Sequence, residues 1–282
     1  TGSLSPQQLI ERCRNLELLD QEMIRQKALD PQLVGNLAMA MSKGYNQWQL
    51  ARSQKDFLCF APALKHLIEL RQEQANQLSE PRSCWETLAQ PFEPDLSLLR
   101  LKELFEPLRQ RLPLLVEKVR CKSRPKKQSW DLDVVAQEKL CDQLLLDWGR
   151  DTSISCVARS PHPFSITLGP RDFRLTTRVV KGQPFSCFLA TAHEWGHSLY
   201  EQGLPNQSHQ WFAWPLGQAT SMAVHESQSL FWENRVARSK AFSERWWKRF
   251  ADAKAPISSS EQLWYLLNPM TPGLNRVEAD EL

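Results

Sequence analysis

Thr191-Ala192-His193-Glu194-Trp195-Gly196-His197 is the stretch that decides the fold of this chain of 282 residues. On an α-helix, positions i and i+4 lie one above the other, so His193 and His197 can direct both imidazoles at one metal ion. Glu194 then lies one step round the same side, where a zinc hydrolase carries its general base. The alternative interpretation is a pair of ordinary histidines on a core helix. We interpret the stretch as a zinc-binding helix.

An apolar stripe supports this helical interpretation. Phe188, Ala192, Trp195 and Leu199 recur at helical spacing on the side opposite the histidines. We therefore expect the apolar face of this helix to pack against the protein core and the histidine face to stay free for a metal.

A catalytic zinc usually takes three protein ligands and keeps a fourth position for water, so a third ligand is needed. Glu226 is the candidate, 226 − 197 = 29 residues after His197 and beyond a segment with room for a loop and the start of a second helix. We expect Glu226 in the middle of an apolar face of that helix, where a carboxylate needs a partner. The metal is one such partner, and an ion pair with an arginine is the alternative. The apolar residues of this face are Ala219, Met222, Ala223 and Leu230.

Composition and charge narrow the classes of fold and partner. Only 10 glycines and few clusters of turn residues favour a mainly α fold. The 35 basic and 32 acidic side chains give a net charge of +3, so neither nucleic acid nor a membrane is expected as a partner. Seven cysteines without a Cys-x-x-Cys pair indicate neither a disulfide framework nor a cysteine zinc site. The sequence contains no apolar run of the length or setting of a signal peptide or a membrane span, so we expect a cytoplasmic protein.

Three regions are expected along the chain, as parts of one continuous helical fold. Residues 1–120 are predicted to be a helical packing region, with three amphipathic helices followed by a helix that Pro107 and Pro113 kink or divide. Residues 121–130 are predicted to be a basic, solvated linker. Residues 131–282 contain the predicted zinc-binding helix and are expected to be the catalytic region.

Two short strands are predicted just before the zinc-binding helix. Phe164-Ser165-Ile166 and Phe173-Arg174-Leu175-Thr176 alternate apolar and polar residues, and prolines and glycines punctuate the run around them. The expected result is a small antiparallel β hairpin that forms one wall of a cleft. Arg174 and Arg178 then become candidates to hold an anion, and the alternative is that both are surface arginines.

Several motifs occur in a fixed order along almost the whole chain. They are His162-Pro163-Phe164, Asp172-Phe173-Arg174-Leu175-Thr176, His193 to His197 with its continuation to Leu204, His225-Glu226-Ser227-Gln228-Ser229, and Arg276-Val277-Glu278-Ala279-Asp280. Upstream, Asp56-Phe57 and Ala61-Pro62-Ala63-Leu64 belong to the same set. In this order the motifs resemble those of the carboxypeptidase Taq family of zinc metallocarboxypeptidases.

The resemblance implies a mainly α, gluzincin-like helical metallopeptidase with the β hairpin before its zinc-binding helix. It implies hydrolysis of the C-terminal peptide bond of peptides with a free C-terminus, with Zn²⁺ or alternatively Co²⁺ as the cofactor and a homodimer as the intact enzyme. The implied roles are metal ligation by His193, His197 and Glu226, catalysis by Glu194, and substrate binding by Asp172, Arg174, Thr176, His225 and Arg276. For His225, a contact with the ligand or substrate and a helix position facing elsewhere both stay open.

Members of the family are longer than this chain. The resemblance implies that an amino-terminal helical portion and the part after Leu282, which carries the family's Gly-x-x-Gln-Asp-x-His-Trp motif, are missing. We therefore expect the truncated chain to be impaired as an enzyme. Two other functions stay open, a zinc endopeptidase without a pocket for a terminal carboxylate and a non-catalytic helical scaffold derived from the enzyme.

Overall fold

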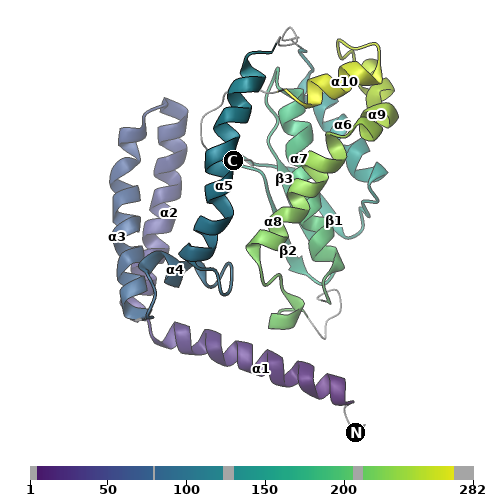
Figure 1. Ribbon diagram of the computed structural model, residues 1–282. Coiled ribbons are helices and arrows are strands. Elements are labelled where there is room, and N and C mark those ends of the chain that lie inside the picture. Colours follow the sequence, from purple (N-terminus) through teal and green to yellow (C-terminus); the bar gives the residue numbers. More distant parts are fainter. Residues whose placement is uncertain (1–4, 79, 123–129, 206–211, 270–282) are drawn as a thin grey trace. The chain divides into compact units, whose positions relative to one another are not determined.

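The computed structural model describes residues 5–78, 80–122, 130–205 and 212–269 of the chain. The chain divides into two compact units, Thr1–Val116 and Glu117–Leu282. The helices and strands, labelled as in Figure 1, are α1 (Pro6–Lys27), α2 (Pro31–Gln54), the 3₁₀-helix η1 (Phe57–Cys59), α3 (Ala61–Leu78), α4 (Cys84–Ala89), α5 (Leu98–Arg120), α6 (Val134–Asp147), β1 (Ser155–Arg159), β2 (Phe164–Gly169), β3 (Asp172–Thr177), α7 (Pro184–Gly203), the 3₁₀-helix η3 (Pro215–Gly217), α8 (Met222–Leu230), the π-helix η4 (Phe231–Ala237), α9 (Lys240–Asp252) and α10 (Ser260–Leu267). The mainly α prediction is confirmed.

The first unit contains the three predicted amphipathic helices, α1 to α3. The α2 helix begins with a strong local signal, since the Asp30 side chain accepts from the backbone N–H of Gln32 and Pro31 occupies the first helical position. Figure 1 shows α2 and α3 side by side as an antiparallel pair, and their shared cluster consists of Leu33, Leu37, Ala40 and Leu70. Local capping therefore sets where α2 starts, and apolar packing pairs it with α3.

Of the two outcomes expected for α5, division by its prolines is wrong, and a kink stays a prediction. It runs as one helix from Leu98 to Arg120, with Pro107 and Pro113 inside it. Each proline removes one intrahelical hydrogen bond, but both prolines are exposed, so water can bond the carbonyl groups that lose their donor. Exposure of this helical face explains why the prolines do not divide the helix.

The second unit has an aromatic core behind α7. Phe188 on α7 contacts Trp246 and Phe250 on α9 edge to face, with ring centroids 5.6 and 5.0 Å apart. Phe188, Ala192 and Trp195 are all fully buried, and Leu199 packs against the same side of the helix. The prediction that the apolar stripe forms the buried face of α7 is therefore confirmed.

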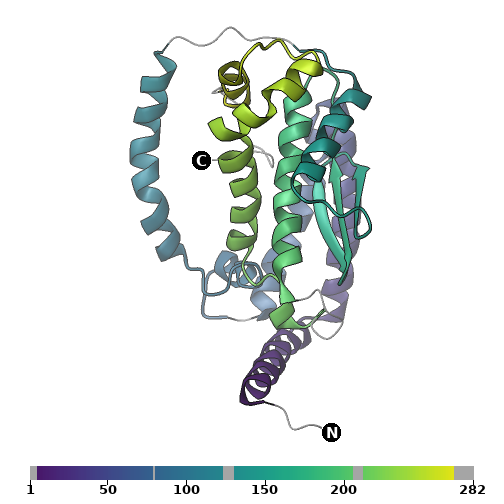
Figure 2. The ribbon, with the colours of Figure 1, turned by 90° about the vertical axis from the view of Figure 1, so that its right-hand side faces the viewer.

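A three-stranded sheet covers one side of α7. The predicted hairpin is confirmed, because β2 and β3 pair antiparallel, and an additional strand, β1, pairs parallel with β3 to give the order β1-β3-β2. Leu175 of β3 packs with Trp195 of α7 and Leu145 of α6. The turned view in Figure 2 shows the sheet on one side of α7 and α8 on the other, so α7 is held between two layers.

Within the described ranges, no helix combines the length and the apolar character needed to cross a lipid bilayer. Residues 123–129 of the predicted basic linker and the predicted substrate residue Arg276 lie outside the described residues.

Candidate metal centre

Two side chains of α7 and one of α8 point at a common volume. The Nε2 atom of His197 lies 3.2 Å from Oε2 of Glu226, and Nε2 of His193 lies 3.7 Å from Oε1 of the same carboxylate. One ligand atom from each of the three residues lies within 4.8 Å of the other two. A zinc ion with bonds of about 2.0 to 2.2 Å keeps tetrahedral ligand atoms roughly 3.4 Å apart. The geometry of His193, His197 and Glu226 therefore fits a divalent metal.

The predicted apolar face around Glu226 is wrong, although Glu226 itself is placed as a ligand would be. The α8 helix begins only at Met222, after the cap residue Ser221, so Ala219 is not part of it. Met222 is 54% exposed, and the Glu226 side chain is 44% exposed. The helix starts later than the periodicity suggested, so the side of α8 that carries Glu226 is partly open. The two histidines hold its carboxylate. The hydrogen bond from His197 is the largest cause that lowers the pKa of Glu226, burial opposes it, and the charges of both histidines lower the pKa further.

Gly196 allows α7 and α8 to approach closely enough for the three ligands to meet. A Cβ atom at this position would lie 2.7 Å from Cα of Ser229 and 2.8 Å from the carbonyl oxygen of Gln228, which are both backbone atoms of α8. Contacts this short cannot form without moving a helix. The sequence analysis assigned no role to Gly196, although a glycine inside a helical pattern is a usable signal of close packing.

Replacing Gly196 with alanine should therefore destabilise the protein, although the same change usually stabilises a helix by up to about 1 kcal/mol. We expect a loss of about 1 to 3 kcal/mol from overpacking, together with weaker zinc binding as α8 carries Glu226 away from the histidines. Thermal unfolding and zinc titration measure the two effects.

Gly35→Ala is the matched control for that variant, because Gly35 also lies inside a helix but has open space around its Cβ position. We expect the control to keep or gain stability and to leave zinc affinity unchanged. Equal effects of the two substitutions would contradict the assignment of Gly196 as a contact between helices.

Carboxylates surround His193 on both ring nitrogens. Its Nδ1 atom lies 3.1 Å from Oε2 of Glu233, in the π-helix η4, and Glu233 is only 4% exposed. Burial by itself would lower the pKa of His193, but the hydrogen bond to Glu233 and the charges of Glu194 and Glu226 raise it to about 9. Without a metal, His193 is therefore protonated at neutral pH. The sequence interpretation did not include Glu233, although it lies seven residues after Glu226 and hence near the same helical face.

His225, next to Glu226 on α8, faces the metal centre. Its ring stacks on that of His197 at a centroid distance of 4.4 Å and an interplanar angle of 23°. Its Nε2 atom lies 3.0 Å from Oε1 of Glu201, one helical turn after His197 on α7. Of the two readings left open for His225, contact with a ligand side chain is the one that the geometry supports.

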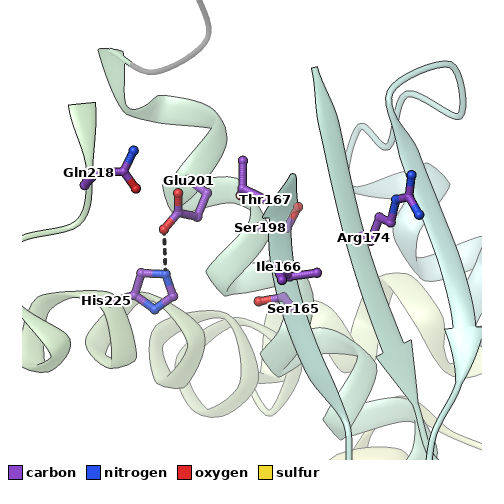
Figure 3. Close-up of a pocket in the computed structure, with 8 residues that line it drawn as sticks. All are labelled: Ser165, Ile166, Thr167, Arg174, Ser198, Glu201, Gln218 and His225. Carbon is purple, nitrogen blue, oxygen red and sulfur yellow. Dashed lines mark hydrogen bonds and ion pairs between the residues drawn. The ribbon is translucent and has the colours of Figure 1, made fainter. Parts of the chain in front are cut away.

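A cavity of about 230 Å³ lies beside this histidine. Figure 3 shows the His225–Glu201 pair on one side of the cavity and the three β2 residues on the other. The lining consists of Ser165, Ile166, Thr167, Arg174, Ser198, Glu201, Gln218 and His225. The cavity thus lies between His225, which stacks on the ligand His197, and the β2 strand, which pairs with β3 in the described sheet.

Three other predicted substrate residues lie on β3, and one of them, Arg174, lines the cavity. Arg174 alternates with the buried Leu175, so it projects from the sheet face opposite α7, and Figure 3 shows it beyond the strands from His225. The Nε atom and one terminal nitrogen of Arg174 donate to Asp172, at 2.8 Å each, and this pairing lowers the pKa of the Asp172 carboxyl. The Thr176 hydroxyl accepts from the Phe164 N–H and bonds to Ser160. Any contact of these residues with a substrate stays a prediction.

Comparisons of the sequence and of the fold with known proteins point to the same protein family. Residues 3–282 match the family model described as carboxypeptidase Taq (M32) metallopeptidase. The chain is 34% identical over 272 residues to thermostable carboxypeptidase 1 of Thermus thermophilus, covering 92% of this chain and 53% of the relative, and 30% identical to carboxypeptidase 1 of Bacillus subtilis, covering 95% and 54%. Its fold is similar to the crystal structure of an M32 carboxypeptidase from Deinococcus radiodurans, with a TM-score of 0.84, 27% identity, and coverage of 100% of this chain and 56% of that one. The chain thus spans about half the length of the curated relatives it matches.

Proposed function

The chain belongs to the carboxypeptidase Taq family of metallopeptidases, and from this premise we propose that it carries the hydrolytic centre of a metallocarboxypeptidase. Its substrates would be peptides with a free C-terminus, from which the last residue is removed. The observation that carries the proposal is the convergence of His193, His197 and Glu226, with the buried Glu194 on the same helix. Since the chain spans about half of its relatives' length, the activity and substrates of the whole protein are part of this proposal.

Two imidazole nitrogens and one carboxylate oxygen form a donor set that suits zinc, and we propose Zn²⁺ as the metal, with Co²⁺ as the alternative. Bound there, the metal would lower the pKa of a water molecule and polarise the carbonyl oxygen of the scissile bond. His193, His197 and Glu226 would hold the metal and leave a further position open.

Glu194 is the proposed general base. It follows the ligand His193 directly on α7 and is 7% exposed, so its carboxylate lies in a largely water-excluded place beside the ligands. In this position it accepts a proton from the attacking water and then delivers the proton to the leaving amine. Both transfers need only one correctly placed carboxylate.

We propose that the peptide lies in the cavity between β2 and α8, next to His225. An exopeptidase must recognise a free carboxylate, for which a guanidinium is well suited. Arg174 and Arg276 stay the residues predicted to bind this carboxylate. Arg174 would do so through the N–H groups that it does not donate to Asp172, or by exchanging those bonds. Asp172, Thr176 and His225 stay the other predicted substrate contacts.

The test compares a peptide that ends in a free carboxylate with its C-terminal amide, using zinc-loaded protein and a chelated blank. We expect release of the last residue from the free acid, and cleavage of the amide slower by about two orders of magnitude or more, because an amide leaves a carboxylate site unpaired. The chain is assayed beside a version extended to the length of its relatives, because we expect the shorter chain to be the slower. Equal cleavage of both peptides would indicate an endopeptidase, and no cleavage by either protein would indicate a non-catalytic scaffold.

The remaining properties inferred from the sequence also stay predictions. They are the homodimeric state of the intact enzyme, a cytoplasmic location, and the absence of nucleic-acid and membrane partners.

A further inference from the structure

The helix that supplies the metal ligand Glu226 also supplies a second carboxylate to the same histidine. Glu233 lies seven residues further on, which is roughly two helical turns, so it leaves nearly the same face of the continuous α8–η4 segment. His193 lies between the two carboxylates, with Nε2 at 3.7 Å from Glu226 and Nδ1 at 3.1 Å from Glu233. One imidazole therefore contacts a single helical segment through both of its nitrogens.

Glu233 is built into the protein rather than left at the surface. Its side chain is 5% exposed, and its second oxygen, Oε1, accepts from Arg238 at 2.8 Å. Arg238 in turn donates to the backbone carbonyl of Leu267 at 2.8 Å, and the Asn268 amide donates to the backbone carbonyl of Arg238 at 3.0 Å. A chain of hydrogen bonds thus runs from His193 through Glu233 and Arg238 to the end of α10.

The second histidine ligand has no comparable support among the described residues. The Nδ1 atom of His197 is buried there without a hydrogen-bond partner, and its ring is held instead by stacking on His225. The oxygens of Glu233 bond His193 and Arg238, and Glu233 faces the Nδ1 atom of His193, whereas Glu226 faces Nε2. Its geometry is that of a carboxylate that orients a ligating histidine, an arrangement found at many zinc sites.

We propose that Glu233 is a positioning residue of the metal centre, which keeps the proton of His193 on Nδ1 and points the Nε2 lone pair at the metal. Arg238 balances the buried charge of Glu233 and links it to α10, so the packing of α10 helps to set the angle of a metal ligand. This inference rests on the proposed function only in requiring that a metal binds at His193, His197 and Glu226. Loss of such a carboxylate typically weakens metal binding about 10- to 100-fold.

The experiment measures zinc affinity by competition with a chromophoric chelator in wild type, Glu233→Ala and Glu233→Gln. We expect affinity about 10- to 100-fold weaker for Glu233→Ala. We expect a smaller loss for Glu233→Gln, because its one carbonyl oxygen can accept from His193 or Arg238 without the charge of a carboxylate. Glu244→Gln, an exposed glutamate on α9, is the control and should bind zinc as the wild type does. Circular dichroism and melting curves identify a variant that fails to fold.

Imidazole ¹⁵N NMR on zinc-loaded wild type gives a second measurement that needs no Glu233 variant. We expect the His193 ring to carry its proton on Nδ1, with His193→Ala used to assign its signals. A proton on Nε2, or a folded Glu233→Gln together with a folded Glu233→Ala that both bind zinc as tightly as wild type, would overturn the inference. If His193→Ala itself keeps wild-type zinc affinity, the metal centre is wrong, so the two failures can be told apart.

Discussion

Glu194→Gln is expected to keep the metal and to lower turnover by a factor of about 10² to 10⁴, the usual contribution of one general base. An amide has nearly the same size as the carboxylate but cannot accept the proton of the attacking water. Glu194 is not one of the three residues whose ligand atoms converge, so its replacement should leave zinc content unchanged. Binding and turnover should therefore separate in this variant.

The measurement pairs the turnover number on a free-acid peptide with the zinc content of the same sample. Both are made on the chain and on the version extended to the length of its relatives, so a slow chain does not hide the effect. Glu244→Gln again serves as the control, because it changes an exposed glutamate of the same unit outside the metal centre. Turnover of Glu194→Gln within a few-fold of wild type would remove Glu194 from the mechanism.

His197→Ala is expected to lower zinc affinity by about 10² to 10³. Zinc sites with four protein ligands bind with about 10 to 16 kcal/mol, so one ligand contributes roughly 3 to 4 kcal/mol, and each 1.4 kcal/mol corresponds to a factor of ten. The His197 side chain is 13% exposed, and its Nε2 atom is 3.2 Å from Oε2 of Glu226, the position of a ligand beside its fellow ligand. Elemental analysis after zinc loading and a competition titration measure the loss.

His66→Ala is the matched control for this variant, since His66 is an exposed histidine on α3 with no part in the site. It should leave zinc content and affinity unchanged. Stoichiometric zinc at equal affinity in wild type and His197→Ala would show that the ligand assignment is wrong.

The same site predicts how zinc binding depends on pH. Without metal the pKa of His193 is about 9, so below that pH zinc must displace a proton and the apparent affinity should rise as the pH increases towards 9. The folding stability of the metal-free protein should change in the opposite direction, because it falls as the pH increases. Because the folded pKa lies above the unfolded value of about 6.5, the protonated His193 stabilises the fold fully below pH 6.5, and this contribution is lost as the pH rises through 9. Melting curves of chelated protein across this range measure it.

The sequence by itself determined the features that lie within one helix or one hairpin. His193 and His197 share a face, and Phe188, Ala192 and Trp195 share the opposite one, because backbone hydrogen bonds fix the angle between residues of a helix. The alternation that predicted β2 and β3 was sufficient for the same reason, since a hairpin is a local structure. The order of the motifs was enough to indicate the family.

Contacts between elements were decided only by the tertiary structure. The β1 strand is stabilised by parallel pairing with β3 across a connection that carries β2, and a five-residue strand has no local pattern strong enough to predict this. The direction of Arg174 follows from which face of the sheet packs on α7. The exposure of Glu226 follows from where α8 begins.

The contacts that support the metal ligands were also decided only by the tertiary structure. Gly196 is needed because of how closely α8 crosses α7, and Glu233 reaches His193 only because the π-helical continuation of α8 packs on that helix. Residue spacing along the chain specifies angles within an element, where each backbone hydrogen bond joins near neighbours. The distance and rotation between two elements depend instead on every side chain packed between them, and so they appear only in the folded protein.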